Sequence, residues 1–122
     1  MGHVYDDQNI FAKILRGEIP NATVLETEHA LAFRDIHPQA PTHVLVIPKG
    51  PYVCFDHFAQ EASDAEIVDY VRAVGEVCRM EGVAEDGWRL IANAGMNGVQ
   101  EVPHLHVHVL AGRNLGRMLS KG

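Results

Sequence analysis

Three histidines separated by single apolar residues are the part of this chain best suited to chemistry. They are His104, His106 and His108, with Leu105, Val107 and Val109 between and after them. Successive side chains of a strand point to opposite faces, so a strand over residues 102–110 would place all three imidazoles on one face and the apolar side chains on the other. Imidazoles are costly to bury without partners. The pattern therefore favours a functional site over a purely structural role.

An imidazole can act as a nucleophile, a general acid or base, or a metal ligand. A shared metal ion is the weakest of these alternatives, because three alternate side chains on a straight strand span roughly 13 Å at ~3.3 Å per residue. One ion could not be reached by all three without distortion. We therefore expect no metal in this site.

Three weaker signals lie elsewhere in the chain. His43 shares a strand face with Leu45 and Ile47, and Asp35 ends an otherwise apolar strand face. Taken alone, these two are ordinary strand-end or surface residues. The loop over residues 94–101 contains glycines and can present backbone N–H groups to an anion, although glycines also serve plain turns.

Composition limits the class of protein. The chain has 122 residues, 47% of them hydrophobic, and a formal net charge of −6. It is long enough for one domain with one core, and its negative charge argues against a nucleic-acid partner. It contains no apolar run long enough for a membrane span and no signal-peptide pattern at its start. Cys54 and Cys78 are far apart in sequence, which favours a reduced, cytoplasmic protein.

The hydrophobic pattern predicts an α+β domain, with a five-stranded, largely antiparallel sheet, one main helix and one short helix. The short helix covers residues 10–15 after acidic caps at Asp6 and Asp7, and the main helix covers residues 64–81 after a capping box at Ser63 and Glu66. The expected strands cover residues 23–27, 30–36, 42–47, 87–93 and 102–110, whereas residues 51–60 are expected to be irregular. We predict a single domain over residues 1–122, with a core at about residues 8–113 and a tail at 114–122.

The triad and its flanking segments resemble the histidine-triad (HIT) nucleotide-binding family, and within it the bacterial members of the Hint branch. The resemblance covers nearly the whole chain. The segments that carry it are Ile10–Pro20, Ala32–His43, Gly98–Pro103, the triad itself and Leu110–Arg113, followed by the Leu-Gly-x-Met-Leu pattern of the tail.

This resemblance implies a two-layer domain that forms a homodimer by joining two sheets. It implies hydrolysis of purine nucleoside phosphoramidates, such as adenosine 5′-phosphoramidate, or of aminoacyl-adenylates, to AMP plus an amine or amino acid. The reaction would pass through a nucleotidyl-histidine intermediate without a metal or other cofactor. The expected ligands are AMP, GMP or their phosphoramidates.

By the same resemblance, His106 is the nucleophile, His108 binds the α-phosphate, and His104 and His43 orient the nucleophile and relay protons. Asp35 would accept hydrogen bonds from the ribose hydroxyls. The remaining residues expected to contact the nucleotide are Phe33, Ile36, Asn93, Gln100, Glu101 and Val102.

The sequence departs from the family pattern in four places, and two of them, Glu101 and the tail, concern the leaving group. Glu101 stands where eukaryotic members have a serine, and Val99 and Ala111 each replace a glycine. The eukaryotic Trp-Pro-Pro-Gly tail is absent. These differences leave the released amine open. They also keep an alternative function in view, a nucleotide-binding regulatory module with little turnover.

Overall fold

The computed structural model describes residues 3–120. Its centre is a five-stranded antiparallel sheet in the order β1-β2-β3-β5-β4. The strands are β1 (Thr23–Glu26), β2 (Ala30–Arg34), β3 (Thr42–Pro48), β4 (Trp88–Ala92) and β5 (Val107–Ala111), and the helices are α1 (Ile10–Leu15), α2 (Phe55–Glu61) and α3 (Asp64–Met80). The predicted α+β class and five-stranded antiparallel sheet are confirmed. Within residues 3–120, no helix has the length and apolarity needed to cross a membrane.

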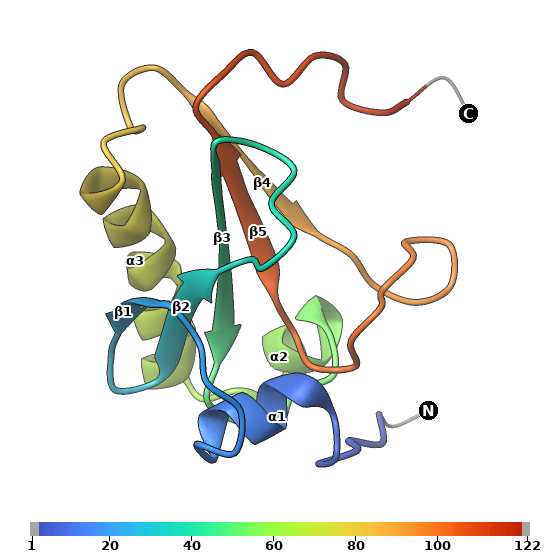
Figure 1. Cartoon of the computed structure of the whole chain (residues 1–122). Helices are drawn as coiled ribbons and strands as arrows, with labels where there is room; N and C mark the ends of the chain where they lie inside the picture. The colour runs from blue at the N-terminus through green and yellow to red at the C-terminus, as the bar shows by residue number, and fades with distance from the viewer. Residues whose placement is uncertain (1–2, 121–122) are drawn as a thin grey trace.

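The main helix α3 covers one face of the sheet (Figure 1). The buried side chains of α3 and of β2, β3 and β5 meet in the principal core, which includes Ala30, Ala32, Val44, Val46, Tyr70, Val74, Val77, Val107 and Val109. Tyr70 satisfies its buried hydroxyl by donating to the carbonyl of Val46 at 2.7 Å. This core holds the buried side chains of β5 in place. It therefore sets the direction of the residues that precede β5.

A second apolar cluster lies on the opposite face of the sheet, under α1. Its buried members are Phe11, Ile14, Leu31, Phe33, Leu45 and Ile47. The ladder pairs Phe33 with Leu45 and Leu45 with His108. The histidines of the triad therefore border this cluster.

The helix ends show which local signals were sufficient. The predicted capping box at Ser63 and Glu66 is confirmed, with both reciprocal hydrogen bonds present. The expected acidic caps of α1 are wrong, because Asn9 is the N-cap and its side-chain oxygen accepts from the N–H of Ala12 at 2.9 Å. The backbone carbonyl of Asp6 accepts from the side-chain amide of Asn9 at 2.7 Å, and its carboxylate accepts from the N–H of Gln8 at 2.9 Å, before the helix begins.

The segment predicted to be irregular contains the helix α2, so that prediction is wrong and the sheet carries a third helix. Cys54, the N-cap of α2, makes no side-chain cap hydrogen bond. The ring of Phe58 instead packs between those of Tyr52 and Tyr70, at centroid distances of 5.1 and 5.0 Å. The contact of Phe58 with Tyr70 on α3 stabilises this helix. A local sequence pattern does not predict such a contact.

The histidine strand is shorter than predicted. Only its second half, from Val107, pairs with β3 and β4. Before that point, the N–H of His104 donates to Val102 at 2.9 Å and that of Leu105 donates to Tyr52 at 2.8 Å, which takes the chain out of the ladder. The alternation survives nonetheless, because Leu105, Val107 and Val109 are all buried in the principal core.

Leu105 separates the first two histidines of the triad and is 1% exposed. We expect Leu105→Ala to lower the free energy of unfolding by about 2–5 kcal/mol, because it leaves a cavity in the principal core. Urea denaturation measures this change. The matched variant Leu119→Ala, at a side chain that is 76% exposed, should change stability by less than about 0.5 kcal/mol. Equal losses for the two variants would contradict the assigned burial of Leu105.

Candidate active site

Four histidines from β3, β5 and the segment before β5 gather on the sheet face that α1 partly covers. His43, His104 and His106 are 3%, 0% and 7% exposed, and His108 is half-buried. The ring centroid of His108 lies 5.1 Å from that of His43 and 5.2 Å from that of His106. The structure therefore brings together all four residues predicted to be catalytic.

A hydrogen bond to the backbone of His104 determines which ring nitrogen of His106 carries the proton. Its Nδ1 lies 2.8 Å from the backbone carbonyl of His104. Because a carbonyl oxygen only accepts, Nδ1 must carry the proton and Nε2 must keep its lone pair. No residue within 3–120 bonds to this Nε2. Every fully buried side-chain nitrogen or oxygen there has a hydrogen-bond partner, so an Nε2 without one must reach solvent. The Nε2 lone pair is therefore accessible, as a nucleophile requires.

The ring of His104 is engaged at both nitrogens. Its Nε2 donates to the carbonyl of Pro48 at 2.8 Å, and its Nδ1 lies 2.6 Å from the hydroxyl of Tyr5. Since the first contact places the proton on Nε2, the Tyr5 hydroxyl donates to Nδ1. The arrangement supports the predicted orienting role of His104, through its carbonyl. It leaves neither ring nitrogen free to relay a proton.

His43 and His108 form a second hydrogen-bonded chain. The N–H of Gln39 donates to His43 Nδ1 at 3.1 Å, so the proton of His43 is on Nε2. This Nε2 lies 2.9 Å from His108 Nδ1 and 3.4 Å from the Asp35 carboxylate. By donating to His108 Nδ1, His43 places the proton of His108 on Nε2, where it can be donated to a ligand.

Burial keeps these rings neutral. It lowers the pKa of His104 to about 4 and that of His108 to about 4, and the neighbouring histidines add to both effects. Burial also lowers the pKa of His43, against the attraction of Asp35. The pKa of His106 falls for the same reason, opposed by its hydrogen bond to His104 and by nearby carboxylates. At pH 7 the site therefore contains neutral imidazoles in defined tautomers.

The three residues predicted to contact ribose and base have different surroundings. Asp35 follows β2 and accepts from the N–H of His37 at 2.8 Å. Phe33 is buried in the second apolar cluster, with its ring 5.6 Å from that of Phe11, whereas Ile36 is 83% exposed. Asp35 and Ile36 lie beyond the end of β2, at the edge of the histidine cluster.

The residues predicted to meet the phosphate come from both sides of the loop before the triad. Asn93 follows β4 directly after Ala92, which pairs with Val107, so Asn93 and His106 continue from the same ladder pair. The side chain of Gln100 donates to the carbonyls of Val53 and Val102, at 2.6 and 2.9 Å.

Backbone hydrogen bonds limit which N–H groups of this loop could donate to a phosphate. The N–H of Gln100 donates to Gly95 at 3.1 Å. Within the described part of the chain, the amides of Glu101 and Val102 have no such partner. The free backbone donors of the segment predicted to bind phosphate therefore begin at Glu101.

Val99 occupies a backbone conformation that favours glycine. Its φ is 55°, which is strained for a β-branched residue. The side chain is 69% exposed. Replacing the family's glycine here therefore places strain in the loop without filling the site.

Gly112 and Arg113 lie just after β5 and contact the loop that bonds to His43. Gly112 has a φ of 100°, and a Cβ there would lie 2.7 Å from Pro41. Arg113 donates to the carbonyl of Gln39 at 3.2 Å. Because the N–H of Gln39 bonds to His43, the end of β5 helps to hold the second histidine chain.

Within residues 3–120, one group has donor atoms close enough together for a metal ion, and it is not the triad. Asp35, His43 and His108 offer atoms within 4.8 Å of one another. In the structure Nε2 of His43 lies between the other two groups, 2.9 Å from Nδ1 of His108 and 3.4 Å from the Asp35 carboxylate. The hydrogen bond from His43 to His108 accounts for the proximity of the two imidazoles.

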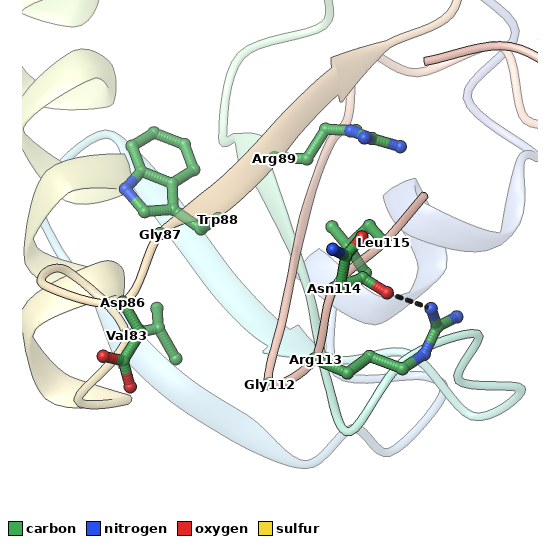
Figure 2. A pocket seen from close by; sticks show the side chains of 9 residues that line it. All are labelled: Val83, Asp86, Gly87, Trp88, Arg89, Gly112, Arg113, Asn114 and Leu115. Carbon is green, nitrogen blue, oxygen red and sulfur yellow. Dashed lines mark hydrogen bonds between the residues drawn. The ribbon is translucent and has the colours of Figure 1, made fainter. Parts of the chain in front are cut away.

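A cavity of about 560 Å³ lies at the other end of β4 and β5 (Figure 2). Trp88 and Arg89 line it from β4, and Arg113 and Asn114 line it from the chain after β5. Arg89 donates to the carbonyls of Gly116 and Arg117 at 2.8 and 3.2 Å and so holds the tail beside the cavity. No histidine lines this cavity, so it is separate from the histidine cluster.

Sequence reasoning missed two aromatic contacts to the triad. Tyr5 bonds to His104 across 99 positions of sequence. The ring of Phe11 lies edge-on to that of His106, at a centroid distance of 5.0 Å. The apolar pattern of residues 10–15 predicts a helix but not the contact of Phe11 with His106, and the sequence around Tyr5 carries no local signal for its contact.

Comparison with known proteins identifies the family of this chain. Residues 16–115 match the HIT domain. The chain is 62% identical over 122 residues to an uncharacterized 13.2 kDa HIT-like protein of Azospirillum brasilense, covering 100% of both. It is 43% identical over 114 residues to the purine nucleoside phosphoramidase of Escherichia coli strain K12, covering 93% of this chain and 95% of that one.

A solved structure gives the same result. The histidine triad protein from Clostridium difficile matches with a TM-score of 0.81 and 37% identity, over 93% of this chain and 98% of that one. The predicted family is thus confirmed by sequence and by structure. The chain belongs to the HIT domain family.

Proposed function

We propose that this protein is a purine nucleoside phosphoramidate hydrolase. Membership of the HIT family and 43% identity to a purine nucleoside phosphoramidase support a nucleotide-binding hydrolase. The observation that carries the finer proposal is the state of His106, whose Nδ1 donates to a carbonyl while its Nε2 stays accessible. The substrate would be adenosine 5′-phosphoramidate, an aminoacyl-adenylate or a related purine compound.

In the first half-reaction, the Nε2 lone pair of His106 attacks the α-phosphorus. The Nε2–P bond forms, the P–N bond breaks, and its electron pair leaves with the amine, which takes up one proton from water. The imidazole becomes positively charged during attack, and the hydrogen bond from its Nδ1 to the carbonyl of His104 strengthens as it does so. The product is a nucleotidyl-histidine, which divides one difficult displacement into two easier ones.

In the second half-reaction, water attacks the same phosphorus and His106 Nε2 departs. The attacking water loses one proton, so one water molecule is consumed over the whole cycle. The N–H at Nε2 of His108, held in that tautomer by His43, donates to a phosphate oxygen in both halves. No metal or other cofactor takes part in either half.

The nucleotide would be held at the edge of the histidine cluster. Asp35 would accept from the ribose hydroxyls with the lone pairs that the N–H of His37 leaves free. Ile36, which is exposed beside it, would cover the base together with the edge of Phe33. On the phosphate side, Asn93 and the amides of Glu101 and Val102 complete the set of donors.

The proposal includes a homodimer in the cytoplasm. β4 is an edge strand of the sheet, and its Trp88 and Leu90 are 40% and 46% exposed. β1, at the other edge, is shorter and irregular in its pairing. These features support joining two sheets through β4. Cys54 and Cys78 are both buried and free, which agrees with a reducing compartment.

Replacing the nucleophile tests the reaction directly. We expect His106→Asn to lower kcat by at least about 10³-fold on a tryptamine adenosine phosphoramidate, because no other accessible nucleophile replaces Nε2. Steady-state fluorescence measures kcat. The control His29→Asn, in the turn between β1 and β2, should keep kcat within about twofold.

Retained turnover in His106→Asn would refute the nucleophile. A wild-type protein that binds AMP but does not cleave any phosphoramidate would favour the regulatory-module alternative.

The pH profile tests the protonation state of the site. Attack requires unprotonated His106 Nε2, and burial lowers the pKa of this residue below its ordinary value of 6.5. As the pH falls, kcat/KM should therefore decline with a midpoint below pH 6.5. Rates measured with a substrate that does not itself titrate between pH 4.5 and 8 give the midpoint. A midpoint at or above 6.5 would contradict a buried, neutral nucleophile.

A further inference from the structure

The segment before α1 reaches the histidine cluster through one side chain. The hydroxyl of Tyr5 lies 2.6 Å from Nδ1 of His104, and the two rings meet edge to face at a centroid distance of 5.5 Å. This is the only hydrogen bond that His104 Nδ1 receives from residues 3–120. Because His104 is completely buried, no solvent can replace it without a rearrangement.

The segment carrying Tyr5 is itself anchored. The side chain of Arg16 donates to the carbonyl of Asp7 at 2.7 Å, and that of Asn9 donates to the carbonyl of Asp6 at 2.7 Å. Both anchoring residues flank α1, whose Phe11 packs on His106. Tyr5 is therefore held beside His104 by the helix that borders the nucleophile.

Three hydrogen bonds then connect Tyr5 and β3 to the ring of His106. Tyr5 donates to Nδ1 of His104, Nε2 of His104 donates to Pro48, and the carbonyl of His104 accepts from Nδ1 of His106. The first two bonds clamp the ring of His104 between the N-terminal segment and β3. The third bond depends on where that clamp holds the His104 backbone.

We propose that Tyr5 is a positioning residue for the nucleophile, acting through His104 on the orientation of His106. This role rests on the proposed function, in which His106 Nε2 attacks phosphorus. Tyr5 makes no hydrogen bond to that nitrogen, so removing its hydroxyl should slow the chemical step without weakening nucleotide binding. Burial raises the pKa of Tyr5, which keeps the hydroxyl protonated as a donor across the working pH range.

The test is Tyr5→Phe, which keeps the aromatic ring and removes only the donor. We expect kcat to fall about five- to tenfold, the effect of one lost hydrogen bond, while KM and the Kd for AMP stay within twofold. The matched control is Tyr52→Phe, which removes a hydroxyl that bonds to Glu66 at 2.9 Å. This control should keep kcat within twofold.

A spectroscopic measurement separates positioning from a general loss of stability. In protein labelled with 15N-histidine, Tyr5→Phe should move the His104 Nδ1 signal downfield, as expected when an unprotonated nitrogen loses a hydrogen-bond donor. The proton on His106 Nδ1 should also exchange faster with water. Tyr52→Phe should change neither signal, whatever its melting temperature.

The proposal is overturned if Tyr5→Phe keeps kcat within twofold, if KM rises in parallel with the fall in kcat, or if the His104 and His106 signals do not move. A wild-type protein without phosphoramidase turnover would overturn the proposed function instead. In that case the 15N spectra still decide whether Tyr5 holds His104 and His106.

Discussion

The hydrogen bond from His106 Nδ1 to the backbone carbonyl of His104 is the interaction on which the site depends. At 2.8 Å it fixes the proton on the nitrogen that faces the protein and leaves the lone pair on the nitrogen that faces the site. A titratable side chain in this place could gain a proton and become a donor. A backbone carbonyl never donates. The tautomer of the nucleophile is therefore a property of the fold and is independent of pH across the neutral range.

That bond requires the residues up to His106 to lie outside the ladder of β5. A continuous strand would commit the His104 carbonyl to strand geometry, whereas β5 begins only at Val107. Leu105 enters the principal core, and the ring of His104 is held by Pro48 and Tyr5 on the other side. The core therefore fixes the turn in the chain, and the turn presents the carbonyl.

The sequence predicted those parts of the fold that depend on local patterns. The strands, the main helix and its capping box follow from alternation, periodicity and short-range caps, and the resemblance led to His43 and Asp35 as partners of the triad. The helix α2 and the contact of Tyr5 were missed, because Phe58 and Tyr5 act through residues far away in sequence. The early end of the histidine ladder was missed because Leu105 keeps the alternation while its N–H pairs with Tyr52.

The tautomers of the four histidines are the central claim, and neutron diffraction from the deuterium-exchanged protein at neutral pD tests them most directly. Deuterium should appear on Nδ1 of His106, and on Nε2 of His43, His104 and His108. Deuterium on Nε2 of His106, or on both of its nitrogens, would contradict a neutral nucleophile whose lone pair faces the site.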